Sequence, residues 1–251
     1  MKVILKFVYN TVARIYFLID AIILIVIAML IFVTTYPFDP KRKVLHIFSG
    51  FWGLHYFWIN PFWKIKFECD ATIDKNRSYV IVSNHQSMLD ICIMHKIHLI
   101  FKWVSKAEVF KMPFVGRLLK MHGDIRINRG DGSSAKKMFN EARSWIEQGC
   151  SISIFPEGTR SGTGRINPFK EGAFMIAKLN KLPVLPVVIE GTADMLPPRG
   201  VVLGGKATAK IHVLPVIPAE TVSLMKTKDL SDLLYNIISE EHKRMAPDKY
   251  K

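Results

Sequence analysis

A histidine and an aspartate lie five positions apart where an apolar run of the chain ends. Residues 79–83 (YVIVS) lead directly into residues 84–90 (NHQSMLD), which contain His85 and Asp90. An imidazole can take a proton from an alcohol, and a nearby carboxylate can fix its tautomer and stabilise the imidazolium. Positions five apart on a regular helix diverge by about 140° and cannot share a face. We therefore expect His85 in the turn before a helix, folded back over the first turn that carries Asp90.

His85 also has a structural interpretation, in which it helps to cap the following helix, and an isolated His–Asp pair would favour it. The pair is not isolated, because three further blocks follow: residues 123–129 (GDIRINR), 155–161 (FPEGTRS) and 185–189 (LPVVI). In this order and at these separations, the four blocks resemble the 1-acylglycerol-3-phosphate O-acyltransferases, the bacterial-type lysophosphatidic acid acyltransferases of phospholipid synthesis. The resemblance covers roughly residues 64–220, and Asn128 departs from it because many members carry Asp there.

The resemblance implies transfer of an acyl group from a thioester to the sn-2 hydroxyl of 1-acylglycerol 3-phosphate, which forms phosphatidic acid. The donor is then acyl-CoA or acyl carrier protein, and no cofactor is expected. A thioester is already activated, so the acceptor hydroxyl can attack it directly without a protein nucleophile. We expect His85 to be the general base and Asp90 to orient it.

The third block is expected to bind the acceptor. Gly158 allows close approach of the backbone, and Arg160 offers a planar fork suited to phosphate. The resemblance implies that this block and Arg129 bind the glycerol phosphate, with Glu157 near the reactive hydroxyl. A surface ion pair is the alternative for Arg160, and a solvated lysine is the alternative for Lys106, a further phosphate candidate. The expected substrate-binding residues are Glu157, Gly158, Thr159, Arg160, Arg129 and Lys106.

The sequence predicts no metal site. Its eight histidines are dispersed, and the nearest pair, His95 and His98, has no third ligand at a spacing suited to zinc. A Walker loop and a dinucleotide glycine fingerprint are also absent from the sequence.

The charge of the chain favours an anionic partner. Its 251 residues include 35 Lys and Arg against 21 Asp and Glu, a net charge of +14, with 49% hydrophobic residues. That hydrophobicity favours a membrane surface, and no nucleic-acid-binding module is recognisable, so no nucleic acid is expected as a partner. Three scattered cysteines indicate reduced thiols rather than a disulfide framework.

Two apolar segments precede the motifs. Residues 15–33 are apolar except for Asp20, and the aromatic residues of 44–63 suit the headgroup interface. Basic residues flank the first segment on both sides, so a hairpin that enters and leaves one leaflet keeps them all in the cytoplasm. We predict a membrane-anchoring hairpin over residues 1–63, with two crossing helices as the close alternative. Ordinary core helices fit the second segment tolerably and the first badly. The catalytic domain would then lie on the cytoplasmic face of the cell inner membrane or plasma membrane.

Residues 64–251 are predicted to form one α/β domain, with a mixed, largely parallel sheet flanked by helices. Short apolar runs alternate with polar helical stretches through this part of the chain. The expected strands cover residues 64–69, 79–82, 98–104, 124–128, 151–155, 184–189 and 207–213. The expected helices cover residues 89–96, 113–120, 133–148, 170–179 and 230–244.

Two other functions fit parts of the pattern. Within the same class, the acceptor could be another lysophospholipid or an amino lipid. From a different class, a non-catalytic protein could use its basic charge to bind anionic lipid at a membrane surface. Lipid adhesion needs neither the His–Asp block nor the arginine-bearing loop, so these motifs favour the enzyme.

Overall fold

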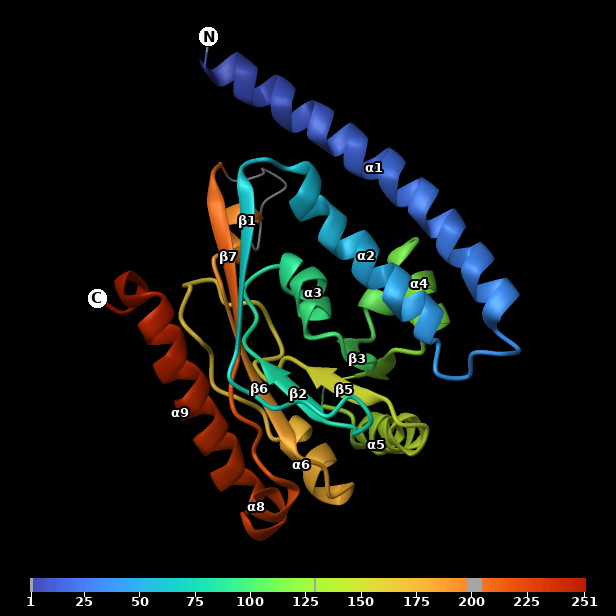
Figure 1. The fold of residues 1–251 in the computed structure, drawn as a ribbon, viewed down its shortest axis with the longest axis vertical. Coiled ribbons are helices and arrows are strands. Elements are labelled where there is room, and N and C mark those ends of the chain that lie inside the picture. Colours follow the sequence, from blue (N-terminus) through green and yellow to red (C-terminus); the bar gives the residue numbers. More distant parts are fainter. Residues whose placement is uncertain (1, 129, 198–204) are drawn as a thin grey trace.

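A seven-stranded sheet forms the centre of the protein (Figure 1). The structure, a computed structural model, describes residues 2–128, 130–197 and 205–251, without the side chains of residues 2–10, 13 and 14. The strands are β1 (Trp63–Cys69), β2 (Val80–Ser83), β3 (Phe101–Lys106), β4 (Ile125–Ile127), β5 (Ser151–Ile154), β6 (Val184–Glu190) and β7 (Ala207–Val213). Their spatial order is β1-β7-β6-β2-β5-β3-β4.

All neighbouring strands run parallel except β6 and β7, which are antiparallel. The expected mixed, largely parallel α/β sheet is therefore confirmed. All residues of β2 and β6 are buried, as befits central strands that are covered on both faces. The carboxyl ends of β2, β5 and β3, three neighbours in the sheet, meet at one edge, where ligands bind in open α/β sheets.

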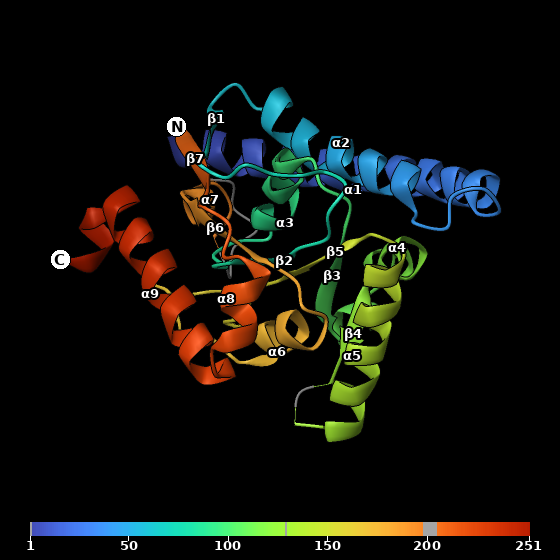
Figure 2. The ribbon, with the colours of Figure 1, turned by 60° about the horizontal axis from the view of Figure 1, so that its bottom comes forward.

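Helices cover both faces of the sheet (Figure 2). One face packs against α2 (Lys43–Ile59), α3 (Leu89–Ile93), the 3₁₀ turn η1 (Met94–Ile97) and α7 (Thr192–Met195). The other packs against α5 (Gly132–Glu147), α6 (Gly172–Leu179), α8 (Ala219–Leu224) and α9 (Thr227–Met245). The 3₁₀ turn η2 (Val109–Lys111) leads into α4 (Val115–His122), and η3 (Pro247–Tyr250) follows α9.

The seven expected strands and five expected helices are all present; the strand over residues 207–213 has the expected bounds, and the bounds of the others are shifted. The helix expected over 89–96 is α3 followed by the tighter turn η1. The strand expected from His98 begins only at Phe101, because His98 adopts a left-handed φ of 57° and cannot continue an extended strand. The short helices α7 and α8 were not expected, since four and six residues are too few to show a helical period.

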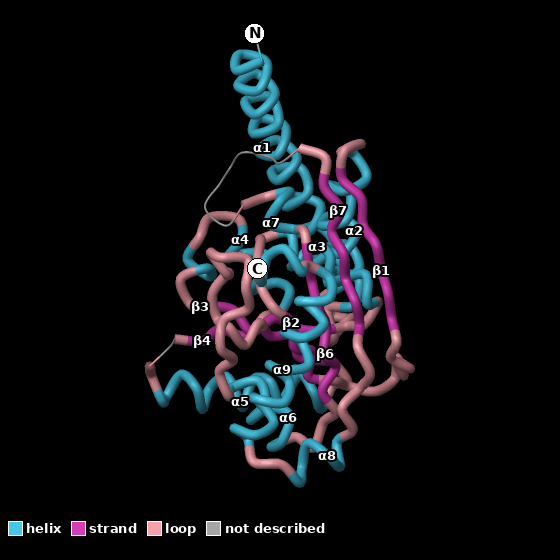
Figure 3. Tube along the Cα trace, turned by 90° about the vertical axis from the view of Figure 1, so that its left-hand side faces the viewer, coloured by secondary structure: helices cyan, strands magenta, loops and turns pink. Residues whose placement is uncertain are grey.

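The first apolar segment is part of a longer helix, α1 (Lys2–Thr35). The helix extends back from the apolar run because residues 2–35 contain no Gly or Pro to interrupt it. Its 21 residues Ile15–Thr35 are long and apolar enough to cross a bilayer, and only 17% of the most apolar window is buried. Figure 3 shows α1 projecting beyond the sheet at one end of the molecule.

The second segment, α2, lies between α1 and the α/β domain (Figure 1). Gly50 and Gly53 let it approach closely: a Cβ on Gly50 would lie 3.1 Å from His95, and one on Gly53 would lie 2.9 Å from the Cα of Cys92. Other side chains of α2 remain exposed, among them Val44, Ile47, Phe51 and Trp58. One side of α2 thus packs against the rest of the protein, and the other side, which we call the open side, is exposed to solvent.

A polar contact joins the two helices within the apolar hairpin. Asp20 of α1 accepts a hydrogen bond from the Tyr56 hydroxyl at 2.7 Å, and its other oxygen lies 3.3 Å from His55 Nε2. Trp52 Nε1 donates to the same Tyr56 oxygen at 2.8 Å. The one acidic residue of the apolar segment therefore has partners on α2.

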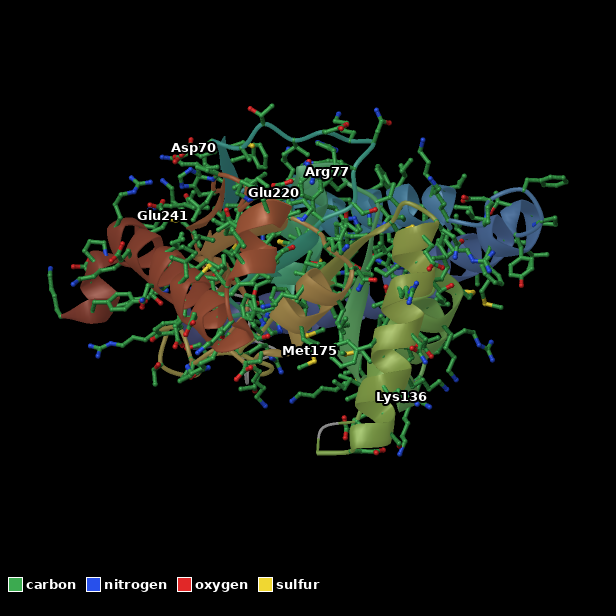
Figure 4. The ribbon with its side chains drawn as sticks, turned by 90° about the horizontal axis from the view of Figure 1, so that it is seen from below. Asp70, Arg77, Lys136, Met175, Glu220 and Glu241 are labelled. Carbon is green, nitrogen blue, oxygen red and sulfur yellow. The ribbon has the colours of Figure 1, made fainter. Side chains whose placement is uncertain are left out.

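The far edge of the sheet is tied to α9 by a histidine. His212 of β7 lies 2.7 Å from Glu241 of α9 and 3.0 Å from Asp70, which follows β1. Figure 4 shows Asp70 and Glu241 on the same side of the molecule, away from Lys136 on α5. This contact holds α9 across the back of β6 and β7.

The close packing of α2 generates a first prediction. Gly53→Leu should lower the free energy of unfolding by about 1–3 kcal/mol, because its side chain would push against the backbone of Cys92. Gly132→Leu is the matched control, since no atom lies within 4 Å of a Cβ at that position. Chemical denaturation in detergent micelles would measure both variants. Equal stability for both would contradict the close contact between α2 and α3.

Candidate active site

His85 lies in the loop after β2, and Asp90 lies in the first turn of α3. His85 Nδ1 is 2.8 Å from Asp90 Oδ2, as the five-residue spacing predicts for a side chain folded back over the helix start. The backbone N–H groups of Gln86 and Ser87 donate to that same oxygen at 2.6 and 2.8 Å. The loop is therefore wrapped around the Asp90 carboxylate.

The second oxygen of Asp90 is also used. The Thr192 hydroxyl, at the start of α7, donates to Oδ1 at 2.5 Å, and Asp90 is fully buried. A carboxylate that receives these N–H and O–H donors acts as an acceptor. His85 Nδ1 must then carry the hydrogen that it shares with Asp90, which leaves Nε2 with a free lone pair to accept a proton.

Aromatic rings fix the plane of the imidazole. The His85 ring stacks on Phe155, with centroids 4.0 Å apart and planes 6° apart. Phe155 stacks in turn on Trp103 of β3, at 4.9 Å and 23°. This three-ring stack runs from the loop after β2, past the end of β5, to Trp103 within β3, so the imidazole is held by the sheet as well as by Asp90.

The block at residues 155–161 forms the loop after β5. Gly158 has a φ of 71°, a left-handed conformation that a glycine adopts without steric cost. The Ser161 N–H donates to the His85 carbonyl at 2.8 Å, and the Glu157 carboxylate accepts from the His85 N–H at 2.7 Å. The two strand-end loops are therefore bonded to each other through the backbone of His85.

Glu157 is buried behind His85 rather than open to a ligand. Its second oxygen accepts from the Asn167 N–H at 2.8 Å, and the residue is only 3% exposed. Burial raises the pKa of Glu157 to about 7, against the opposing effect of the two backbone hydrogen bonds. Both oxygens of Glu157 already accept hydrogen bonds from backbone N–H groups. A direct contact between Glu157 and the acceptor therefore stays a prediction. The geometry suits a positioning role.

A cavity of about 310 Å³ opens beside His85. Four of the expected substrate-binding residues line it: Lys106, Gly158, Thr159 and Arg160. Lys170 adds a further cation, and apolar side chains from several elements form much of the wall, namely Met88, Ile91, Val109, Ile127, Met138 and Ile154. Basic and apolar groups thus meet at the imidazole. Arg129, the remaining expected ligand, lies outside the described residues.

Hydrogen bonds from residues more than a hundred positions downstream fix the loop that carries His85, on the side of β6 and α9. The Asn84 amide bonds to both the N–H and the carbonyl of Ile189 at 2.8 Å. The Gln86 amide donates to Glu190 at 2.9 Å, and His242 Nε2 of α9 lies 2.6 Å from the same Glu190 oxygen. Burial alone would raise the pKa of Glu190, but hydrogen bonds from His242, Lys249 and Gln86 lower it to about 2. These contacts and the role of Thr192 are not predicted by the motifs in the sequence.

One signal for them is present in the sequence. Glu190 and Thr192 directly follow the apolar run 185–189, where a parallel strand ends, so their side chains are available at the same edge as His85. Among the described residues, no group of three or more His, Cys, Asp or Glu could hold a metal ion.

Residues 64–190, half of the chain, match the family model described as acyltransferase. The chain belongs to the acyltransferase family. This match spans His85, Asp90, Lys106 and the loop after β5, so the resemblance drawn from the four blocks is confirmed at the level of the family.

Several relatives carry one name. A chloroplastic 1-acyl-sn-glycerol-3-phosphate acyltransferase of Brassica napus is 33% identical over 202 residues, 77% of this chain and 57% of the relative. A chloroplastic enzyme of the same name from Arabidopsis thaliana is 34% identical over 179 residues, 70% of this chain and 50% of the relative. The chain thus spans about half the length of these curated relatives.

A solved structure has the same fold. The 1-acyl-sn-glycerophosphate acyltransferase PlsC of Thermotoga maritima superposes with a TM-score of 0.78 at 22% identity, covering 96% of this chain and 97% of that one. The similarity extends over the two N-terminal helices as well as the sheet, because it covers almost the whole of both chains.

The raised pKa of Glu157 predicts a pH-dependent stability. Between its usual value of 4.5 and about 7, the folded protein holds a proton on Glu157 that the unfolded chain has released. The contribution of Glu157 to the free energy of unfolding is therefore fully present below pH 4.5. It falls by up to about 3 kcal/mol as the pH rises to about 7. Glu157→Gln removes this titration, so its free energy of unfolding should fall less than that of the parent over this range. If the free energy of unfolding of both proteins fell equally between pH 4.5 and about 7, that result would contradict the raised pKa of Glu157.

Proposed function

We propose that the protein transfers an acyl group from a thioester to the sn-2 hydroxyl of 1-acylglycerol 3-phosphate and so forms phosphatidic acid. The observation that carries the proposal is the His85–Asp90 pair, 2.8 Å apart, at a cavity that combines cationic and apolar walls. The names of the relatives support this acceptor, since several of them are 1-acyl-sn-glycerol-3-phosphate acyltransferases.

The chemical step follows from the tautomer that Asp90 imposes. His85 Nε2 accepts the proton of the acceptor hydroxyl while its oxygen attacks the thioester carbonyl carbon, and the imidazolium that forms is stabilised by Asp90. The tetrahedral intermediate collapses with cleavage of the carbon–sulfur bond, and the departing thiolate takes the proton back from His85. His85 thus returns to its starting state without a covalent intermediate on the protein.

The phosphate of the acceptor would be held by the basic wall of the cavity. Arg160 can form a bidentate, charge-assisted pair with phosphate, and Lys106 contributes a point charge from the end of β3. Arg129 joins this set in the proposal by virtue of its block in the sequence. Gly158 and Thr159 bring backbone close to the ligand, and Glu157 positions the His85 loop.

The protein would work at a bilayer. Its acceptor has a long acyl chain, and α1 with the open side of α2 offers an apolar surface on which a row of large side chains is exposed. We propose that residues 1–63 anchor the protein in one leaflet of the cell inner membrane or plasma membrane, and that residues 64–251 form the catalytic domain on its cytoplasmic face. The Asp20–Tyr56 hydrogen bond supports a hairpin that enters as one unit.

An assay with purified protein tests the proposal. Lysophosphatidic acid is offered with acyl-CoA and, separately, with acyl carrier protein as the donor, and phosphatidic acid is measured by mass spectrometry. Formation of phosphatidic acid with either donor supports the proposal. Turnover only with a lysophospholipid or amino lipid of another headgroup would reassign the acceptor. Membrane binding without any transfer would favour the non-catalytic alternative.

The proposed base generates a prediction about His85. His85→Asn should lower turnover by roughly 10²–10⁴-fold, because asparagine cannot accept the proton. His98→Asn is the control: it is an exposed histidine outside the cavity whose left-handed backbone asparagine tolerates. Membrane binding should be unchanged in both variants. Near-normal turnover of a folded His85→Asn protein would contradict the mechanism.

Arg160 generates a separate prediction about the acceptor. Arg160→Ala should raise the KM for an acceptor that carries the phosphate, by an amount that corresponds to about 1.5–3 kcal/mol of lost binding free energy. The KM for an acceptor without the phosphate should change little. Arg143→Ala is the control, because Arg143 is exposed on α5 and pairs with Glu147. Equal losses for both acceptors would assign Arg160 to the donor or to the structure of the loop.

A further inference from the structure

We propose that residues 112–115, the turn between η2 and α4, form a second membrane contact that inserts into the interfacial layer of an anionic bilayer beside the cavity. This inference rests on the proposed membrane location of the protein. It concerns a part of the catalytic domain, separate in sequence from the apolar N-terminal helices.

Large apolar side chains are exposed in this turn. Phe114 is 56% exposed, Met112 is 50% exposed and Val115 is 36% exposed. Folding has therefore left three neighbouring apolar side chains in contact with solvent, where they would lose contact with water on entering lipid. A cluster of this kind, outside the core of its own domain, indicates an interaction surface.

The backbone holds these side chains outward at a cost. Phe114 has φ 61° and ψ −58°, and the Val115 N–H donates to the Pro113 carbonyl at 2.6 Å, which closes a γ-turn. This form of the γ-turn is rare and strained. Strained backbone persists where the surrounding structure holds it, often at functional sites. Here Gly116 packs so closely on η2 that a Cβ would lie 2.1 Å from the Phe110 carbonyl oxygen.

The turn continues the apolar surface of α1. Leu118 and Met121 lie three positions apart on one face of α4, and Phe114 immediately precedes this helix. Leu118 and Met121 pack in a cluster with Ile25 and Ala28 of α1, and Figures 1 and 3 show α4 close to the two N-terminal helices. Phe114 is exposed at the N-terminal end of α4, beside this packed cluster in the sequence. It therefore extends an apolar surface that α1 begins.

The charge around the turn matches an anionic bilayer. Lys111, Arg117 and Lys120 are all exposed, and residues 109–123 contain no Asp or Glu. Basic residues close to an apolar insertion are attracted to anionic headgroups. Exposed aromatic and apolar groups with cations around them are the composition of an interfacial contact.

The turn also adjoins the site. Lys106 and Val109, which lead into it, line the cavity, and Met88 lines the cavity while remaining 42% exposed. A lipid contact at residues 112–115 would bring the cavity wall to the level of the headgroups. A lysophospholipid could then reach His85 without leaving the bilayer completely.

Site-specific labelling tests the inference on the full chain. Cys69→Ser, Cys92→Ala and Cys150→Ala remove the native thiols, and retention of turnover checks this background. A nitrobenzoxadiazole label is then placed on Phe114→Cys, on Leu30→Cys of α1, or on Leu224→Cys. Leu224, on α8, is 88% exposed and serves as the control for an exposed apolar residue far from the N-terminal helices. The probes are vesicles of phosphatidylcholine with and without phosphatidylglycerol, carrying nitroxide-labelled lipid as a quencher.

The expected result is a blue-shifted emission and quenching by nitroxide lipid at positions 114 and 30, with neither change at position 224. A water-like label at 114 together with a lipid-like label at 30 would overturn the inference and leave the proposed N-terminal anchor intact. Water-like labels at all three positions would overturn both.

A functional variant gives a second readout. Phe114→Ser should lower transfer to an acceptor embedded in vesicles roughly tenfold, as expected when much of the contribution from burying a Phe side chain is lost. Transfer to a short-chain, water-soluble acceptor should stay the same, as should both activities of the control Leu224→Ser. An equal loss on both acceptors would assign Phe114 to the structure of the site and overturn the inference.

Discussion

The buried carboxylate of Asp90 is the constraint on which the rest of the site depends. It holds the His85 ring, two backbone N–H groups of the preceding turn and the Thr192 hydroxyl. An uncompensated buried carboxylate is costly, and these donors offset that cost only when the loop has one particular shape. The same contacts that make the burial tolerable therefore also set the tautomer and the direction of the imidazole.

Other parts of the protein support this loop from two sides. In front, the loop after β5 is bonded to the backbone of His85 through Glu157 and Ser161. Behind, Gln86 is held by Glu190 and His242, and Arg165 of the β5 loop region donates to the Lys249 carbonyl at 2.7 Å. His242 of α9 thus contacts the loop after β2, and the segment that follows α9 contacts the loop region after β5. Alignment of the reacting groups to within a fraction of an ångström requires support of this kind.

Local patterns in the sequence were sufficient for much of the fold. Apolar runs gave all seven strands, and longer amphipathic stretches gave the five helices, because strand and helix periods are written in neighbouring residues. The His85–Asp90 contact was predictable for the same reason, since five residues separate them. The apolar character of α1 was also readable from composition, whereas the close packing of α2 depended on Gly50 and Gly53, a spacing with no unique meaning in sequence.

Contacts between distant segments could not be predicted in this way. Asn84 meets Ile189 and Asp90 meets Thr192 across about a hundred residues, and only the order of strands in the sheet brings them together. The surroundings of Glu157 could not be predicted for a related reason: its type suggests a ligand, whereas the fold places both of its oxygens on backbone N–H groups. Residue type and spacing thus pointed to the candidate site, while the hydrogen-bond partners and burial of each side chain within it became visible only in the fold.

The most direct test of the role of Asp90 is a steady-state comparison of Asp90→Asn with the parent protein at saturating acceptor and donor. We expect kcat to fall by roughly 10²–10⁴-fold with little change in the KM of the acceptor, because asparagine can hold the loop but can neither fix the reactive tautomer nor stabilise the imidazolium. Circular dichroism would verify that the variant is folded. A folded Asp90→Asn protein with normal kcat and a raised KM would contradict the view that Asp90 orients the base.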